Sequence, residues 1–238
     1  MARLRAGTTG GDGVGDHDLI DLARRQHGAV SRQQALAAGL SSDAIKRRIR
    51  SGAWTRLRKG VFVVGGAPPT WEQEVVGCCL AGGDDVLASH RTGARVWGIV
   101  AADGRTEVLV AGERRVRLPG VRVHQSILLP AVDRTVRNDI PVTSLARTLA
   151  DVSQHQDPIV VGRWIDAAMR VHRLDPLELR SCLARLAGPG RRDTAALRTA
   201  LAERLPGWDP GESDLEARAL LALHRAGLPA RPGLTPTR

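Results

Sequence analysis

The hydrophobic and polar positions near the start of the chain predict two short helices. Apolar residues recur at helical spacing between residues 18 and 27, where a histidine and a glycine end the pattern. A second helix follows Ser31, whose hydroxyl can cap it while the side chain of Gln34 closes a capping box. This helix is expected to bury Ala35 and Leu36 and to end at the next glycine.

The following segment predicts a third helix with one apolar side and one basic side. It begins at Ser41 or Ser42 and runs to Arg50. Ile45 and Ile49, four positions apart, form the face that packs on the other two helices. The basic residues that point to the opposite side are Lys46, Arg47 and Arg50.

A basic hairpin follows the third helix and turns near Lys59. The period-two alternation of a strand places Arg56 and Arg58 on one face, with Thr55 and Leu57 on the other. The returning strand is apolar and is expected to pack on the helices. Three short helices followed by such a hairpin are typical of a winged helix-turn-helix, whose third helix docks in the major groove of DNA.

Beyond residue 66 the pattern changes to a mixture of helices and strands. Helical segments are expected over residues 71–81, 86–98, 145–152, 159–172, 176–187, 193–205 and 213–226. Two strands are expected around a turn rich in arginine and glycine, over residues 106–111 and 116–124. The fold class is therefore mixed α/β and predominantly helical, with an N-terminal winged helix-turn-helix, an α/β middle segment and a helical C-terminal part.

The same pattern divides the chain into four parts. We expect a disordered tail over residues 1–16, a winged helix-turn-helix DNA-binding domain over 17–66, an α/β and then helical domain over 70–205, and a last segment over 208–238. The tail is rich in glycine and lacks the apolar stretch of a signal peptide. No apolar run approaches the roughly 20 residues that a membrane-spanning helix needs.

Charge supports a nucleic-acid partner only where it is concentrated. The formal net charge is +10, but nearly all basic residues are arginines, which is typical of a GC-rich genome and weakens the argument from overall basicity. Residues 41–60 carry seven basic side chains and one acidic one, a density that attracts phosphate. The alternative is a solvated basic face on a protein-interaction module. The candidate DNA-binding residues are Lys46, Arg47, Arg50, Arg56, Arg58 and Lys59.

Few residues point to catalysis or to a cofactor. Cys78, Cys79 and Cys182 form neither a disulfide framework nor a metal motif, and they are typical of small buried residues in a reduced cytoplasmic protein. The seven histidines lack the spacings of zinc sites, so neither a metal nor a cofactor is expected. Ser89 and His90 are interpreted as a packed histidine at a helix start rather than as a catalytic fragment.

Two further charged features are interpreted structurally. Arg147 and Asp151 lie four positions apart on a predicted helix, where a local ion pair is worth a few tenths of a kcal/mol. A functional role for the pair is the alternative. The basic turn over residues 113–117 is interpreted as an exposed hairpin tip, with a second phosphate contact as the alternative.

Three segments give the chain a resemblance to the AbiEi-type antitoxins of type IV toxin–antitoxin systems. They are the winged-helix segment over residues 28–64, ASHRTGARVWGI from residue 88, and VTSLARTLAD from residue 142. The resemblance covers residues 18 to 205. It implies a regulator that binds operator repeats in double-stranded DNA, represses its own operon and counteracts a nucleotidyltransferase-like toxin without a stable complex. It also implies DNA contact by Lys46, Arg47, Arg50, Arg56 and Arg58.

The segment over residues 208–238 resembles the opening of a very-short-patch-repair-like endonuclease domain. Glu212-Ser213-Asp214-Leu215-Glu216 matches the E-S-x-L-E helix of such domains, but neither metal-binding strand follows. Such nucleases cluster several carboxylates around Mg²⁺. Glu216 is therefore expected to be a vestigial nuclease carboxylate, and no catalytic residue is assigned. A truncated endonuclease is the alternative to a non-enzymatic regulator.

Overall fold

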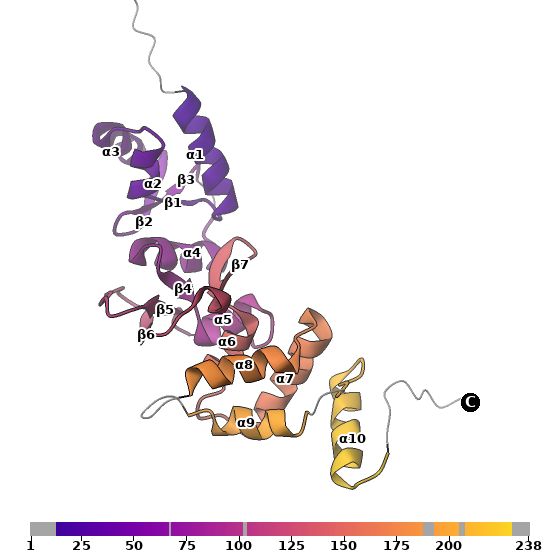
Figure 1. Ribbon diagram of the computed structural model, residues 1–238. Helices are drawn as coiled ribbons and strands as arrows, with labels where there is room; N and C mark the ends of the chain where they lie inside the picture. The colour runs from indigo at the N-terminus through magenta and orange to yellow at the C-terminus, as the bar shows by residue number, and fades with distance from the viewer. Residues whose placement is uncertain (1–12, 67, 102–103, 188–192, 205–207, 230–238) are drawn as a thin grey trace, which may run out of the picture. The chain divides into compact units, whose positions relative to one another are not determined.

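The structure is a computed structural model that describes residues 13–66, 68–101, 104–187, 193–204 and 208–229 (Figure 1). The chain divides into two compact units, of which the first comprises residues 1–86 and 116–119 and the second residues 87–115 and 120–238. Most of the predicted tail lies outside the described residues. Its last four residues belong to a helix that begins at Gly13, so the ordered chain starts earlier than Asp18, where the apolar spacing begins.

The first unit is a helical bundle with a three-stranded antiparallel sheet, in the strand order β1-β3-β2. Its elements are α1 (Gly13–Arg25), β1 (Ala29–Ser31), α2 (Arg32–Ala37), α3 (Ser42–Arg50), β2 (Trp54–Arg58), β3 (Val61–Val64) and α4 (Trp71–Gly82). Three helices and a hairpin in this order confirm the predicted winged helix-turn-helix. The mixed α/β fold class is confirmed as well.

Short-range hydrogen bonds set the ends of α2 and α3. The hydroxyl of Ser31 accepts from the amide of Gln34, and the Gln34 side chain accepts from the amide of Ser31 at 2.8 Å, which confirms the capping box. Ser41 caps α3 by accepting from the amide of Ala44. The prediction for Leu36 is wrong, because α2 spans six residues and Leu36 is 41% exposed.

The core of the first unit joins residues that are distant in the sequence. Its buried members are Leu19, Ala23, Val30, Ala35, Leu40, Ile45, Trp54 and Phe62. Helix α4 packs on all three strands, and the side-chain amide of Gln73 donates to the backbone carbonyl of His27 at 2.9 Å. Helix α4 therefore belongs to the first unit, whereas its sequence position suggested the domain over residues 70–205.

The second unit combines a five-stranded mixed sheet with helices. The strand order is β6-β5-β4-β8-β7, with β4 parallel to β8, β5 parallel to β6 and β7 antiparallel to β8. Its elements are β4 (Val86–Ala88), α5 (His90–Val96), β5 (Glu107–Ala111), β6 (Arg122–Ser126), the 3-10 helix η1 (Ala131–Asp133), β7 (Arg134–Arg137), β8 (Ile140–Thr143), α6 (Leu145–Val152), α7 (Pro158–His172), α8 (Pro176–Leu186), α9 (Ala195–Ala202) and α10 (Asp214–Arg225).

Two sequence-based expectations for this sheet are wrong. Residues 86–88 form a strand rather than the start of a helix, because a short apolar run satisfies either structure and pairing with β8 decides between them. Residues 106–124 do not form a hairpin, since β5 and β6 run parallel and Glu107 lies opposite Arg122. The basic turn over residues 113–117 is consequently part of a crossover connection rather than a hairpin tip.

Helices α6 to α9 share an apolar core whose fully buried members include Leu149, Val161, Ile165, Leu179 and Leu197. Cys182 lies in this core, where burial in apolar surroundings is the main cause that raises the pKa of its thiol to about 12. Cys78 and Cys79 are buried in α4, which confirms the interpretation of the three cysteines as small buried residues.

A fully buried arginine connects the sheet to the helices. The guanidinium of Arg147 on α6 donates to the Asp151 carboxylate at 3.0 Å and to the Asp133 carboxylate at 3.3 Å. It also donates to the carbonyl of Leu128 at 3.0 Å and to the hydroxyl of Ser126 at 3.1 Å. The predicted pair with Asp151 exists, but it belongs to a buried network instead of a solvated helix face.

Replacement of this arginine is expected to destabilise the second unit strongly. Arg147→Met leaves the carboxylates of Asp133 and Asp151 buried without their shared cation, which costs roughly 3–5 kcal/mol. Arg198→Met, at an exposed position on α9, is the matched control and should change stability by less than about 0.5 kcal/mol. Urea unfolding followed by circular dichroism measures both, and equal midpoints for the two variants would contradict the assigned role of Arg147.

Candidate DNA-binding surface

Helix α3 has the two faces that docking into a DNA groove requires. Ala44 and Ile45 are buried in the bundle, and Ile49 packs against the same core. Lys46, Arg47 and Arg50 are exposed, as predicted. The apolar face fixes the orientation of the helix. Packing within the first unit is therefore enough to point the basic face to solvent before DNA binds.

The exposed basic residues of α3 differ in how far they are neutralised. The ammonium of Lys46 lies 3.1 Å from the Asp43 carboxylate, but both groups are exposed and such a pair is weak. Within the part of the chain that the structure describes, Arg47 and Arg50 have no ion-pair partner. Arg48 is half-buried, and its guanidinium lies 5.9 Å from the centre of the Trp54 ring. Arg47 and Arg50 are therefore the most available cations of this helix.

The β2–β3 hairpin supplies a second part of the surface. Arg56 on β2 and Lys59 in the turn are exposed, and Gly60 takes a positive φ of 75° that suits a tight turn. Helix α3 packs against β2, partly through the contact of Arg48 with Trp54. The exposed charges of helix and hairpin therefore belong to one unit with a fixed internal geometry.

The prediction for Arg58 needs correction. A bulge between Arg56 and Arg58 breaks the period-two alternation of the strand. The Arg58 guanidinium forms an ion pair with Glu74 of α4 and donates to the carbonyl of Pro119 at 3.2 Å. Only 15% of the side chain is exposed. The candidate surface thus consists of Lys46, Arg47, Arg50, Arg56 and Lys59.

Glu216 takes part in the start of a helix and in no carboxylate cluster among the described residues. Its carboxylate accepts from the amide of Glu212 at 2.9 Å, while the Ser213 hydroxyl accepts from the amide of Glu216 at 3.1 Å. This is the hydrogen-bond pattern of a capped helix N-terminus. The E-S-x-L-E sequence therefore has a structural explanation, and the resemblance to a nuclease domain stays a prediction.

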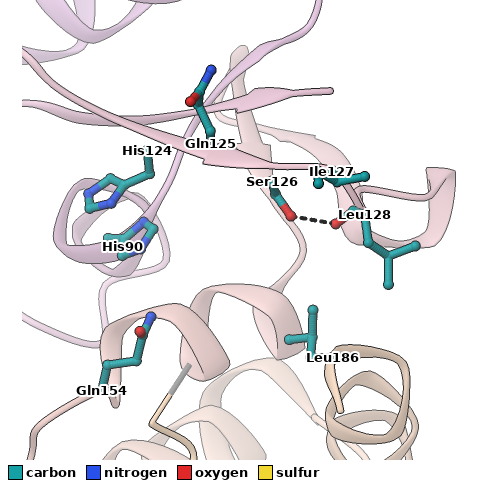
Figure 2. Close-up of a pocket in the computed structure, with 8 residues that line it drawn as sticks. All are labelled: His90, His124, Gln125, Ser126, Ile127, Leu128, Gln154 and Leu186. Atoms are coloured by element: carbon teal, nitrogen blue, oxygen red, sulfur yellow. Dashed lines mark hydrogen bonds between the residues drawn. The ribbon is translucent and has the colours of Figure 1, made fainter. Parts of the chain in front are cut away.

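One group of potential metal ligands occurs in the described residues, and the sequence spacing gave no sign of it. His90, Glu107 and His124 lie together, with one ligand atom from each within 4.8 Å of the others. The ligands come from α5, β5 and β6, so no short motif contains two of them. Figure 2 shows the two histidine rings beside each other at the edge of a cavity of about 330 Å³.

Comparison with known proteins agrees with the N-terminal geometry. Residues 17–65 match the family described as "Transcriptional regulator, AbiEi antitoxin". The resemblance to AbiEi antitoxins is confirmed for this part of the chain. A search of curated proteins found no match for the chain.

A solved structure with a likeness over most of the chain was also found. The crystal structure of RV2827C protein from Mycobacterium tuberculosis is 18% identical, with a TM-score of 0.49, and the match covers 92% of this chain and 82% of that one. A scan of the described residues found no helix with the length and hydropathy needed to cross a membrane. Because the solved structure is only 18% identical, the comparison that bears on function is the AbiEi match over residues 17–65.

The two arginines of the hairpin are expected to differ in their effect on stability. Arg58→Met removes a part-buried ion pair and a hydrogen bond to a carbonyl, and should lower the stability of the first unit by about 1 kcal/mol. Arg56→Met removes an exposed side chain of the same strand and should leave stability within about 0.5 kcal/mol of the wild type. Thermal unfolding measures the stability of both variants. A larger loss of stability for Arg56→Met than for Arg58→Met would contradict the placement of Arg58 in an internal ion pair and of Arg56 on the surface.

Proposed function

We propose that the protein is a DNA-binding transcriptional regulator of the AbiEi antitoxin type. The observation that carries this proposal is the exposed basic face of α3, anchored by Ile45 on its other side and adjacent to the β2–β3 hairpin. The match of residues 17–65 to an antitoxin family of transcriptional regulators supports it.

The two parts of the surface have different expected roles. Helix α3 enters the major groove, where Arg47 and Arg50 contact phosphates or the acceptor edge of guanine. Arg56 and Lys59 of the hairpin contact the sugar–phosphate backbone beside the groove. The backbone contacts supply affinity that does not depend on sequence, and α3 supplies the reading of bases.

The family match extends the proposal to a biological role. We infer a non-enzymatic cytoplasmic antitoxin that binds operator repeats and represses its own operon. Its functional partner is a nucleotidyltransferase-like toxin, which it counteracts without a stable complex. Duplex DNA is then the one macromolecule that the protein binds stably in this role.

The double variant Arg47→Ala plus Arg50→Ala should weaken binding to the DNA upstream of the gene. Removal of two phosphate contacts reduces the slope of log affinity against log salt by about 2. Fluorescence anisotropy of a labelled duplex across a series of salt concentrations measures affinity and slope together.

The control removes the same charge from another part of the first unit. Arg24 and Arg25 are exposed in the last turn of α1, so Arg24→Ala plus Arg25→Ala lowers the net charge equally. This control should keep most of the wild-type slope. If both double variants lose the same slope, general basicity explains binding and α3 has no special role. If the α3 variant keeps the full slope, α3 does not contact phosphate.

The antitoxin role predicts a result in cells. Induction of a nucleotidyltransferase-like gene that adjoins this one should slow growth, and co-expression of this protein should restore it. Because the toxin is counteracted without a stable complex, the two proteins should not co-purify. A neighbouring gene of another class would contradict the antitoxin role while leaving DNA binding intact.

A further inference from the structure

We propose that His90, Glu107 and His124 bind one divalent transition-metal ion of the Zn²⁺ class, with an open coordination position facing the adjacent cavity. Two imidazoles and a carboxylate form a ligand set that binds Zn²⁺ in proteins, and sites with three protein ligands keep a further position for water or substrate. The site lies in the second unit and does not depend on the proposed DNA binding, which concerns the first.

The three ligand atoms are already close to the spacing that a metal ion requires. The Nε2 atom of His124 lies 2.9 Å from a carboxylate oxygen of Glu107. The rings of His90 and His124 are stacked, with 3.5 Å between their centroids and 12° between their planes. Ligand atoms about 2 Å from Zn²⁺ in a tetrahedral site are a little over 3 Å apart, so rotation of the imidazoles completes the geometry.

The backbone holds each ligand in place before any ion binds. Glu107 and His124 lie on adjacent parallel strands, β5 and β6. The amide of Glu107 donates to the Thr92 hydroxyl at 2.8 Å, and the carbonyl of Glu107 accepts from the amide of Ser89 at 3.1 Å. The start of α5, which carries His90, is thereby tied to β5. A site built on strands and a helix start is preorganised, and preorganisation favours metal affinity.

His90 shows two features of a ligand that its surroundings orient. Its Nδ1 atom lies 3.0 Å from the hydroxyl of Ser89, which is fully buried. Histidine ligands use one ring nitrogen for the metal and the other for an outer hydrogen bond that sets the ring orientation. His90 also has a φ of 49°, a left-handed conformation that is uncommon outside glycine and that concentrates at functional sites.

The electrostatics of the cluster favour a cation. The Glu107 side chain is 8% exposed, and the guanidinium of Arg122 lies 3.7 Å from its carboxylate with 67% of the arginine side chain in solvent. A carboxylate buried beside two imidazoles is stabilised by a divalent cation bound between them.

The cavity gives the ion access to solvent. It is lined by both histidines, by the polar side chains of Gln125, Ser126 and Gln154, and by the apolar side chains of Ile127, Leu128 and Leu186. Figure 2 shows the histidine rings at one side of this space. The side chain of Gln154, which follows α6, lies below them. The cavity thus offers polar as well as apolar side chains to a water molecule at the open position.

Metal titration of the full chain tests the proposal. Tag-free protein, stripped with a chelator, should bind one equivalent of Zn²⁺ saturably in calorimetry, and Zn²⁺ should raise the melting temperature. Co²⁺ should give the visible d–d bands of a four-coordinate site with nitrogen and oxygen ligands. His124→Ala and His90→Asn should each abolish saturable binding at the metal concentration that saturates the wild type, with circular dichroism confirming that the variants fold.

Two further variants separate the site from its alternatives. His155→Ala removes a histidine that is 82% exposed and should leave binding unchanged. Ser89→Ala should weaken Zn²⁺ binding about tenfold, since it removes the group that orients His90. Absence of saturable binding in the wild type, or binding that survives both His124→Ala and His90→Asn, would overturn the proposal. In the first case the cluster is a hydrogen-bonded stack of two histidines and a carboxylate, and the DNA-binding result is unaffected.

Discussion

The buried guanidinium of Arg147 is the interaction on which the second unit depends. A charge removed from water is tolerated only when counter-charges and hydrogen bonds surround it, and here two carboxylates, a hydroxyl and a carbonyl do so. These groups come from β6, the loop after it, η1 and α6, while Arg185 of α8 pairs with Asp133 from the other side. The network therefore restricts how sheet and helices can be assembled.

The same network shapes the cavity beside the histidines. Ser126 ends β6 two residues after His124, accepts from Arg147 and donates to the carbonyl of Leu128. Ser126 and Leu128 both line the cavity (Figure 2). The wall next to the proposed metal site is thus held by hydrogen bonds to a buried charge, whereas the ligands themselves are held by β5, β6 and the start of α5. The polar groups that stabilise the fold around Arg147 therefore lie next to the histidines of the proposed metal site.

The DNA-binding unit is organised by a simpler principle. An apolar face on each short element packs into one core, and the charges left outside form the basic surface. Such a surface can be predicted from periodicity when each residue follows the local pattern, as Arg47 and Arg50 do. Arg58 departs from it, because the bulge in β2 and the presence of Glu74 on α4 turn a predicted DNA contact into an internal ion pair.

The sequence by itself determined the winged helix-turn-helix, the capping box of Ser31 and Gln34, and the basic face of α3, because these depend on interactions within a few residues. It also predicted the pairing of Arg147 with Asp151. Only the tertiary structure decided that this pair is buried, that residues 86–88 are a strand, and that β5 and β6 run parallel. It alone brought His90, Glu107 and His124 together. Burial and strand pairing join residues far apart in the chain, and local patterns carry no information about such partners.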